Sequence, residues 1–427
     1  WLETLDFKSK NNKNKRIYMA NLELSEQELI RRQSLDKLRE LGIEPYPAPL
    51  YPVNATAAQI ESEYSAEKEN FQDVCIAGRI MSRRIMGAAS FMELQDASGR
   101  IQVYVKRDEI CPGEDKTMYN TVFKKLLDIG DIVGIKGFAF TTQTGQITVH
   151  AKELTLLSKS LKVLPIVKEA DGKVHDAFTD PELRYRQRYV DLIVNPQVKD
   201  TFIKRAKIIA TMREYFNNAG CLEVETPILQ SIPGGATARP FITHHNTLDI
   251  DMYLRIATEL NLKRLIVGGL EKVYEIGRIF RNEGMDIKHN PEFTTIELYE
   301  AFTDYHGMMD LTEDLISTVT ERVLGTTDIV YQDKEIHLGK GWEKITMMDA
   351  VKKYAGVDFT TVSTSEEAIA LAKSVGVEVE EGKSVGEAMY EVFDEKVEPQ
   401  LIQPTFIMDH PIEISPLAKK KPSNPDY

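Results

Sequence analysis

Five side chains within FRNEGMDIKHNPEFTTIELYEAF (residues 280–302) have types and spacing that could do chemistry together. Phe293, Glu297 and Tyr299 share one face of an alternating run, and Arg281 and Glu283 share a face of the preceding strand if its extension continues. A guanidinium binds a carboxylate or a phosphate through two hydrogen bonds, and a phenylalanine ring stacks on a base. A carboxylate beside a phenol can hold an ammonium group. If the two faces coincide, this hairpin suits a substrate that carries an acid, a base ring and an amine.

A purely structural interpretation of the same run is also open. Glu297 and Glu300 could simply flank the apolar residues Ile296 and Leu298 at an exposed sheet surface. The alternation alone does not decide between a binding face and a solvated face.

Composition and charge narrow the class of protein. The chain has 427 residues, 42% of them hydrophobic and 28% charged, which predicts two to three globular domains. The net charge of −13 argues against general nucleic-acid binding but allows a local RNA site. Three separated cysteines without a CxxC pair favour a reducing compartment, and we expect a cytoplasmic protein. No apolar run is long enough to span a membrane, so we expect no membrane partner.

Several common catalytic motifs are missing from the sequence. It contains no GxxxxGK[ST], no HExxH and no GxGxxG, and the glycine-rich loop at residues 231–241 is not a phosphate-binding loop. His244 and His245 are adjacent on an expected strand and would point to opposite sides, which disfavours a shared metal site. No Ser/His/Asp or Cys/His arrangement suggests a nucleophilic side chain.

The pattern of strands and helices around these residues predicts an α+β protein with an N-terminal β-barrel of the OB type. Residues 71–160 alternate as short strands with turns at residues 96–99 and 142–145, and residues 106–128 fit an inserted loop and helix. Arg79, Arg83 and Arg84 form a basic run there. That run is either a solvated strand edge or, with Phe91, a surface for single-stranded nucleic acid.

The C-terminal part predicts a sheet flanked by helices. Pro196 opens a long amphipathic helix, residues 257–270 form another, and two strands follow as a hairpin. A helical insertion lies near residues 331–400, with helices starting at Ser365 and Ser384, and residues 404–417 return to strand, interrupted at Pro411. The predicted division is a tail and helical extension, a barrel, a linker with the basic stretch 183–196, and a catalytic domain, at residues 1–70, 71–160, 161–196 and 197–427.

Several motifs resemble a known family. FRNEG followed by HNPEF resembles motif 2 of the class II aminoacyl-tRNA synthetases, and GCLEVETPIL resembles their motif 1. The stretches RPFITHHNTLDIDMYLRIATELNLKRLIVGG, FTTIELYEAFTDY and HPIEISPLAKKK are similar to lysyl-tRNA synthetases in particular. The resemblance covers residues 24–424. It implies an OB domain that reads the anticodon, an antiparallel catalytic sheet flanked by helices, and a homodimer formed through the motif 1 helix and strand.

The resemblance also implies a reaction and its partners. The family activates L-lysine with ATP and Mg²⁺ and transfers it to tRNA(Lys). Arg281 would be catalytic, bridging the lysine carboxylate and the α-phosphate. The implied lysine ligands are Gly235, Glu259, Arg281, Glu297 and Tyr299, and the implied ATP ligands are Arg281, Glu283, His289, Asn290 and Phe293. Arg83, Phe91 and Gln102 match anticodon-binding positions, whereas Gln146 stands where the family has Glu.

The resemblance departs from the family at the C-terminal end. No counterpart of motif 3 or of the acidic magnesium ligands is recognised, so we expect the metal ligands beyond Tyr427 and none within the chain. Residues 1–18 are basic and of low complexity, and they are interpreted as a tail or as upstream sequence. Three alternatives follow from these observations: a catalytically incompetent fragment that binds RNA through its barrel, a lysyl ligase acting on an elongation factor, and an aspartyl or asparaginyl synthetase. The barrel argues against the second, and the negative charge of Glu297 argues against the third.

Overall fold

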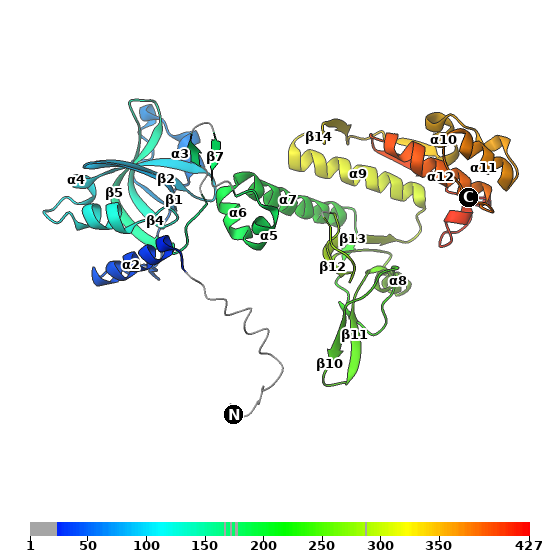
Figure 1. Cartoon of the computed structure of the whole chain (residues 1–427), viewed down its shortest axis with the longest axis horizontal. Coiled ribbons are helices and arrows are strands. Elements are labelled where there is room, and N and C mark those ends of the chain that lie inside the picture. Colours follow the sequence, from blue (N-terminus) through cyan, green and yellow to red (C-terminus); the bar gives the residue numbers. More distant parts are fainter. Residues whose placement is uncertain (1–23, 166–167, 171–172, 176–177, 287) are drawn as a thin grey trace. The chain divides into compact units, whose positions relative to one another are not determined.

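The computed structural model describes residues 24–165, 168–170, 173–175, 178–286 and 288–427. The chain divides into two compact units, Trp1–Lys199 and Asp200–Tyr427, and each is described by itself (Figure 1). The expected N-terminal tail at residues 1–18 lies outside the described residues.

The first unit contains a closed five-stranded barrel, which confirms the predicted OB-type fold. Its strands, in the order β1-β2-β3-β5-β4 around the barrel, are β1 (Val74–Met86), β2 (Ala89–Gln95), β3 (Arg100–Lys106), β4 (Ile132–Thr141) and β5 (Ile147–Ser158). Ile101, Val103 and Val105 point into the core, as the alternation of β3 predicts. Only the β3–β5 pair of this barrel is parallel, and it closes the cylinder.

The barrel closes because the long strand β1 pairs with two neighbours and because Gly137 lets two strands approach closely. The N-terminal half of β1 pairs with β4, and its C-terminal half pairs with β2 across a register shift between Ile80 and Ser82. On β4, the register against β5 shifts between Lys136 and Gly137. A Cβ atom on Gly137 would lie 1.9 Å from the His150 carbonyl oxygen, so only glycine allows the two backbones to approach so closely.

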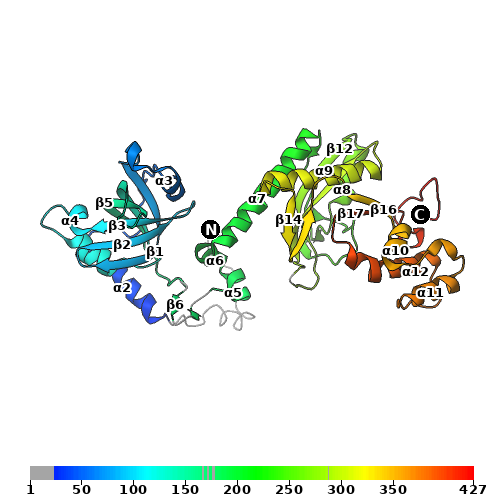
Figure 2. The same ribbon diagram turned by 90° about the horizontal axis from the view of Figure 1, so that it is seen from above.

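Short helices surround the barrel. They are α2 (Glu26–Glu40), α3 (Ala57–Glu63), η1 (Ala66–Lys68), α4 (Arg107–Ile110) and the π-helix η2 (Met118–Leu126). A capping box between Ser25 and Glu28 starts α2, and the buried Leu38 joins its apolar face to the barrel core. Figure 2 shows α2 beside one end of the barrel. The region 106–128, predicted as an inserted loop and helix, contains the two helices α4 and η2.

The segment expected as a linker contains regular structure. It holds the strands β6 (Lys168–Ala170) and β7 (Lys173–His175) and the helices α5 (Pro181–Arg186) and α6 (Arg188–Val194). The buried Asp191 carboxylate accepts hydrogen bonds from Arg184 at 3.0 Å, from Asn195 at 2.7 Å and from Arg188. The basic side chains thus fold the two helices around one carboxylate, a contact that the expectation of a plain basic linker missed.

The second unit is built on the sheet β13-β12-β8, formed by β8 (Leu222–Glu223), β12 (Lys272–Phe280) and β13 (Glu292–Glu300). The β12–β13 hairpin is antiparallel, as predicted, whereas β8 pairs with β12 in parallel. One face of the sheet packs on α7 (Pro196–Asn218) and α9 (Tyr305–Leu324). Tyr274, Ile276, Ile296 and Leu298 supply the sheet side of that core.

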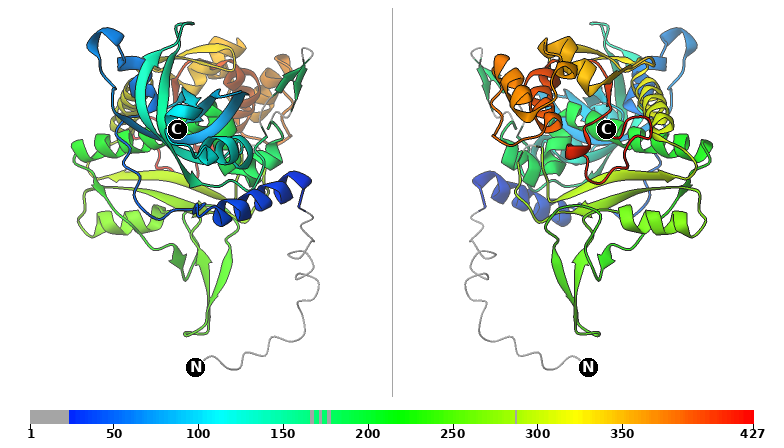
Figure 3. Two further views of the ribbon diagram at one scale, coloured as in Figure 1. Left: turned by 90° about the vertical axis from the view of Figure 1, so that its left-hand side faces the viewer. Right: turned by 90° about the vertical axis from the view of Figure 1, so that its right-hand side faces the viewer.

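A smaller antiparallel sheet is formed by the residues between β8 and β12. It is formed by β9 (Leu229–Gln230), β10 (Ile242–His245) and β11 (Ile250–Leu254), and helix α8 (Glu259–Val267) follows it. The β10–β11 hairpin extends away from the rest of this unit (Figure 3). His244 and His245 are neighbours on β10 and so lie on opposite faces, as expected.

The remaining elements are the β14–β15 hairpin and a helical module with its own apolar core. They are β14 (Asp328–Tyr331), β15 (Lys334–His337), β16 (Glu343–Thr346), α10 (Met347–Ala355), η3 (Phe359–Thr361), α11 (Ser365–Ser374), α12 (Val385–Val392), η4 (Phe393–Val397), η5 (Glu398–Gln400), β17 (Thr405–Met408) and η6 (Ile412–Ile414). The two expected helices are present, but the insertion region opens with the β14–β15 hairpin. The strand expected to resume after Pro411 is instead the 3-10 turn η6.

Candidate active site and RNA-binding surface

The β12–β13 hairpin separates a core face from a polar face. Phe293, Glu297 and Tyr299 share the face opposite to the helices, because their β12 partners are Ile279, Glu275 and Val273 in antiparallel register. The intervening residues of β13 pack against α7 and α9. The structure therefore brings the three β13 side chains onto one face, as the alternation predicted.

Arg281 reaches this face from a loop. The expected continuation of β12 to Arg281 and Glu283 is wrong, because β12 ends at Phe280 and the Glu283 N–H turns back to the Arg281 carbonyl at 2.9 Å. The Arg281 backbone N–H donates to Pro291 at 2.9 Å, and its guanidinium lies 5.4 Å from the centre of the Phe293 ring. Among the described residues its buried Nε has no hydrogen-bond partner. Glu283 lies exposed in the loop.

Glu297 is held by two donors. Its Oε1 accepts the backbone N–H of Thr258 at 3.1 Å, and its Oε2 accepts the Tyr299 hydroxyl at 3.3 Å. Burial, and then the Glu297 and Glu259 carboxylates, raise the pKa of the Tyr299 phenol, so it stays protonated and remains a donor. A carboxylate fixed in this way leaves lone pairs for a cationic group.

Gly235 and Glu259 meet at the start of α8. Gly235 has a φ of +87°, and a Cβ atom there would lie 3.1 Å from the Cβ atoms of Ala257 and Glu259. The Glu259 carboxylate contacts the Lys263 ammonium at 2.6 Å, one helical turn later. That ammonium lies 5.9 Å from the centre of the Tyr299 ring. Gly235, Glu259 and Tyr299 therefore surround the first turn of α8.

His289 and Asn290 lie in the exposed loop between the strands. The His289 Nδ1 is 2.7 Å from Asp286 Oδ2, and Asp286 Oδ1 accepts the backbone N–H groups of Lys288 and His289. The hydrogen bond from the His289 side chain, followed by those from the backbone, lowers the pKa of Asp286 to about 2. The loop thus holds His289 by its own turn and places it off the sheet.

A buried polar cluster on the β12 side of this face was missed by the sequence interpretation. The Arg255 guanidinium contacts the Glu275 carboxylate at 2.5 Å, and both side chains are almost fully buried. The Thr226 hydroxyl donates to the second oxygen of Glu275 at 2.7 Å. A signal was available, because Arg255 and Glu275 each interrupt an otherwise apolar stretch, YLRIA and VYEIG.

The barrel carries a separate hollow on its outer surface, with a volume of about 910 Å³. Arg83, Phe91 and Gln102 line it, so the structure brings together the three residues predicted there. The hollow is lined further by Tyr104, Phe140, Gln146 and His150. Tyr104 shares the outer face of β3 with Gln102, which was the signal that could have found it.

Aromatic rings form a continuous platform in this hollow. The Tyr104 ring lies 5.1 Å from that of Phe91 and 5.0 Å from that of His150, and the Phe140 and His150 rings are 5.6 Å apart. Burial lowers the pKa of His150, which keeps its ring neutral at physiological pH. Neutral aromatic faces beside polar groups suit the stacking of unpaired bases.

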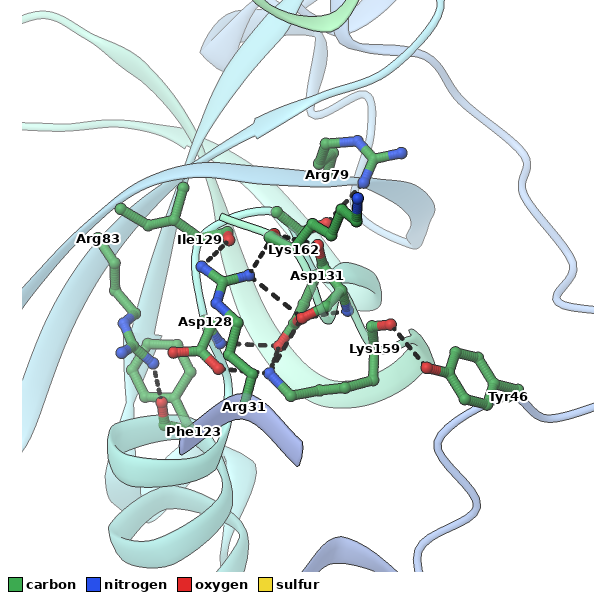
Figure 4. A network of polar contacts seen from close by, with 12 residues as sticks. Arg31, Tyr46, Arg79, Arg83, Phe123, Asp128, Ile129, Asp131, Lys159 and Lys162 are labelled. Carbon is green, nitrogen blue, oxygen red and sulfur yellow. Dashed lines mark hydrogen bonds and ion pairs between the residues drawn. The ribbon is translucent and has the colours of Figure 1, made fainter. Parts of the chain in front are cut away.

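Arg83 is fixed at the edge of the hollow by η2. Its guanidinium donates to the Phe123 carbonyl and lies 5.7 Å from the centre of the Phe123 ring. Burial lowers the pKa of Arg83, and the Asp128 and Asp131 carboxylates oppose that shift. Figure 4 shows this arginine beside a larger polar network.

That network ties the N-terminal helix to the barrel. The buried Lys159 ammonium contacts Asp128 at 2.5 Å and Asp131 at 2.9 Å (Figure 4). Arg31 of α2 donates to the carbonyls of Ile129, Ser160 and Lys162 at 2.9, 3.1 and 2.9 Å. The loop that follows η2 is therefore held from the barrel and from α2 together.

Comparison with known protein families gives a match for the C-terminal part of the chain and another for the barrel. The family of class II tRNA synthetases (D, K and N) matches residues 180–427, more than half of the chain. The chain belongs to this synthetase family. In addition, the OB-fold nucleic acid binding domain matches residues 74–157, which are the barrel strands.

Curated relatives of this class II synthetase are highly similar. The lysine–tRNA ligase of Porphyromonas gingivalis is 56% identical over 410 residues, which cover 96% of this chain and 71% of that protein. The lysine–tRNA ligase of Thermoanaerobacter pseudethanolicus is 56% identical over 419 residues, covering 98% of this chain and 81% of that protein. The one from Moorella thermoacetica is 53% identical over 398 residues, 93% of this chain and 78% of that protein. In the described parts of the synthetase, no helix has the length and apolar composition needed to cross a membrane.

Proposed function

We propose that this synthetase is a lysine–tRNA ligase, which activates L-lysine with ATP and transfers it to tRNA(Lys). The observation that carries the proposal is the polar face of β13, where Glu297 and Tyr299 form an anionic, hydrogen-bonded surface beside Arg281 and Phe293. The names of the curated relatives support the same substrate.

The proposed lysine site separates the two amines of the substrate. Glu297 binds the ε-ammonium with help from the Tyr299 hydroxyl, and Glu259 with the Gly235 backbone binds the α-ammonium. Lys263 contacts Glu259 at 2.6 Å, so this carboxylate accepts an ammonium group. Arg281 binds the lysine carboxylate through its guanidinium fork.

The proposed ATP site lies around Arg281 and Phe293. Adenine stacks on the Phe293 ring, and Arg281 bridges to the α-phosphate. The buried Nε of Arg281, which has no partner among the residues that the structure describes, supports a ligand role, since a buried donor normally finds a partner. Glu283, His289 and Asn290 are proposed to contact ATP from the exposed loop between the strands.

The chemistry needs positioning rather than a nucleophilic side chain. The lysine carboxylate oxygen attacks the α-phosphorus, and pyrophosphate leaves as the new bond forms. The 3′-terminal hydroxyl of the tRNA then attacks the lysyl carbonyl, and AMP leaves. Arg281 holds the two anionic reactants in line and neutralises charge that develops between them.

Magnesium is proposed as the metal that accompanies ATP. Among the described residues, no group of three or more His, Cys, Asp or Glu side chains could hold a metal ion. The metal is proposed to bind through the ATP phosphates, a common mode for Mg²⁺, where it would neutralise phosphate charge.

The barrel is proposed to read the anticodon. Phe91 and Tyr104 offer stacking faces, and Gln102 and Gln146 offer amide groups, in one hollow with Arg83. The proposed domains are those predicted from the sequence, with the barrel at residues 71–160 and the catalytic domain at 197–427. We also propose a cytoplasmic homodimer that forms through the motif 1 helix and strand.

Lysine-dependent ATP–pyrophosphate exchange by the full-length protein tests the proposal. Glu297→Gln keeps the size of the side chain and removes its charge, which costs about 1.5–3 kcal/mol for a charge-assisted contact. The KM for lysine should therefore rise about 10- to 150-fold, while the KM for ATP changes less.

Glu300→Gln is the matched control. Glu300 lies on the same strand but on the opposite face, where it contacts Lys272 at 3.0 Å. It should leave both KM values nearly unchanged. Equal effects of Glu297→Gln on lysine and ATP would contradict the assignment, and exchange that depends on aspartate or asparagine would overturn the proposed substrate.

A further inference from the structure

A short buried segment between β11 and α8 contacts two residues of the proposed lysine site, Gly235 and Glu297, and the strand end before Arg281. Its residues Arg255, Ile256, Ala257 and Thr258 are 3%, 2%, 7% and 1% exposed. The Thr258 N–H holds Glu297 at 3.1 Å, and Ala257 lies against Gly235. At its start, the Arg255 carbonyl accepts the Phe280 N–H at 3.0 Å, one residue before Arg281.

The Arg255 side chain anchors this segment across the sheet. Its Nε donates to the Arg278 carbonyl at 2.8 Å, and its Nη1 donates to the Thr226 carbonyl at 3.1 Å and to Glu275 at 2.5 Å. Three stretches distant in sequence thus meet at one guanidinium.

Gly277 makes room for that guanidinium. A Cβ atom at this position would lie 2.3 Å from the Nη2 atom of Arg255. The face of β12 therefore combines a residue without a side chain with a charged residue, Glu275, two positions earlier. This combination suits the passage of one arginine over the strand.

We propose that Arg255 and Glu275 are positioning residues for the lysine site. Their ion pair fixes the position of the segment Arg255–Thr258. The backbone of this segment in turn positions Glu297 and the end of the strand before Arg281. The proposal rests on the proposed assignment of Glu297 and Arg281 to lysine. Neither Arg255 nor Glu275 touches the reacting atoms in this scheme.

The physical reason for a charged pair here is geometric rather than energetic. Replacing a buried ion pair with apolar residues of similar volume is often neutral or stabilising, because desolvation offsets the attraction. A planar guanidinium, however, fixes several acceptors at defined angles, which a lysine ammonium or an apolar side chain does not do. Small misplacements of binding groups have large effects on rate.

The double variant Arg255→Met/Glu275→Leu separates stability from positioning. It leaves no unpaired buried charge, so its melting temperature should fall only by the cost of the lost hydrogen bonds to Thr226 and to the Arg278 carbonyl, and the variant should stay folded. Its kcat/KM for lysine in pyrophosphate exchange should nevertheless fall about 10- to 100-fold, the scale of a misplacement near 1 Å. Arg322→Met is the control, because Arg322 forms an exposed ion pair with Glu214 in the same unit. It should change neither quantity.

Arg255→Lys serves as the conservative variant and shows whether the effect passes through Glu297. It keeps the charge and loses the fork, so it should raise the KM for lysine in the parent protein. In a Glu297→Gln background the same substitution should have much less effect, because residues acting as one unit are not additive.

Each outcome decides a different point. A stable double variant with parental kcat/KM would overturn the positioning role, as would full additivity between Arg255→Lys and Glu297→Gln. If the double variant unfolds, the coupling between those two single substitutions still decides the proposal. A Glu297→Gln variant with unchanged lysine KM would instead refute the proposed lysine assignment itself.

Discussion

Replacing Lys159 with methionine should destabilise the barrel strongly, because it leaves a buried carboxylate without its counter-charge. The Lys159 ammonium lies 2.5 Å from Asp128 Oδ2, 3.1 Å from Asp131 Oδ1 and 2.9 Å from Asp131 Oδ2. The side chains of Lys159 and Asp131 are both 0% exposed. Removing one member of such a pair costs about 3–5 kcal/mol.

The lower end of this range applies to Asp131. After the substitution its carboxylate still accepts the backbone N–H groups of Asp128 and Ser160, both at 2.7 Å. Asp128 is partly exposed and can turn toward water. We therefore expect a loss of about 3 kcal/mol in the free energy of opening of the barrel, or roughly 100-fold faster amide exchange at neutral pH.

The defect should depend on pH in a defined direction. Burial raises the pKa of Asp131, and Lys159 opposes that rise, so the pKa rises further in Lys159→Met. A carboxyl with a folded-state pKa above its unfolded value stabilises the fold less as the pH rises through that interval. Stability of the variant relative to the parent should therefore be regained as the pH falls below neutral.

Hydrogen exchange of the barrel strands in the intact protein, corrected for intrinsic rates, measures this effect. Lys136→Met is the matched control, since Lys136 pairs with Glu153 at 3.0 Å on the surface of the same barrel. Exposed pairs of this kind contribute about 0–1 kcal/mol. Equal protection in the two variants, or a defect of Lys159→Met that grows on acidification, would refute the reasoning.

Two further predictions concern the barrel hollow and the sheet. Phe91→Ala should weaken tRNA binding by about 1–3 kcal/mol, the contribution of one stacked base, with lysine-dependent pyrophosphate exchange nearly unchanged; a parallel loss of exchange would mean that Phe91 is structural. Gly277→Ala should displace the Arg255 guanidinium, because the added Cβ atom would lie 2.3 Å from it. The expected result is a lower melting temperature with a higher KM for lysine, and an unchanged KM would show that the arginine moves without consequence for the site.

Local patterns in the sequence predicted much of the fold. The alternation of Ile101, Val103 and Val105 predicted β3, and the alternation from Phe293 to Tyr299 predicted the polar face of β13. These predictions succeeded because a strand exposes alternate residues whatever packs against it. Pro196 marked the start of α7 for an equally local reason, namely its fixed φ angle.

The sequence failed where a distant partner decides the local structure. Residues 183–196 looked like a basic linker, but Asp191 becomes buried among Arg184, Arg188 and Asn195 and folds α5 and α6 around itself. Likewise, the alternation suggested that β12 continued beyond Phe280, whereas the backbone turns at Arg281 and bonds to Pro291 across the hairpin.

Residue types in the sequence indicated which side chains could take part in catalysis or binding. The contacts that hold these side chains in position exist only in the tertiary structure. Arg281, Glu297 and Tyr299 were candidates from residue type and spacing, because charge and aromatic character are properties of single side chains, and the family resemblance implied their proposed roles. Their supports were not, since Thr226, Arg255 and Glu275 lie 20 to 49 positions apart and meet only when the sheet assembles. Because this arginine and this glutamate are removed from water, each must satisfy the charge of the other. Their contact thereby fixes the backbone that carries the site.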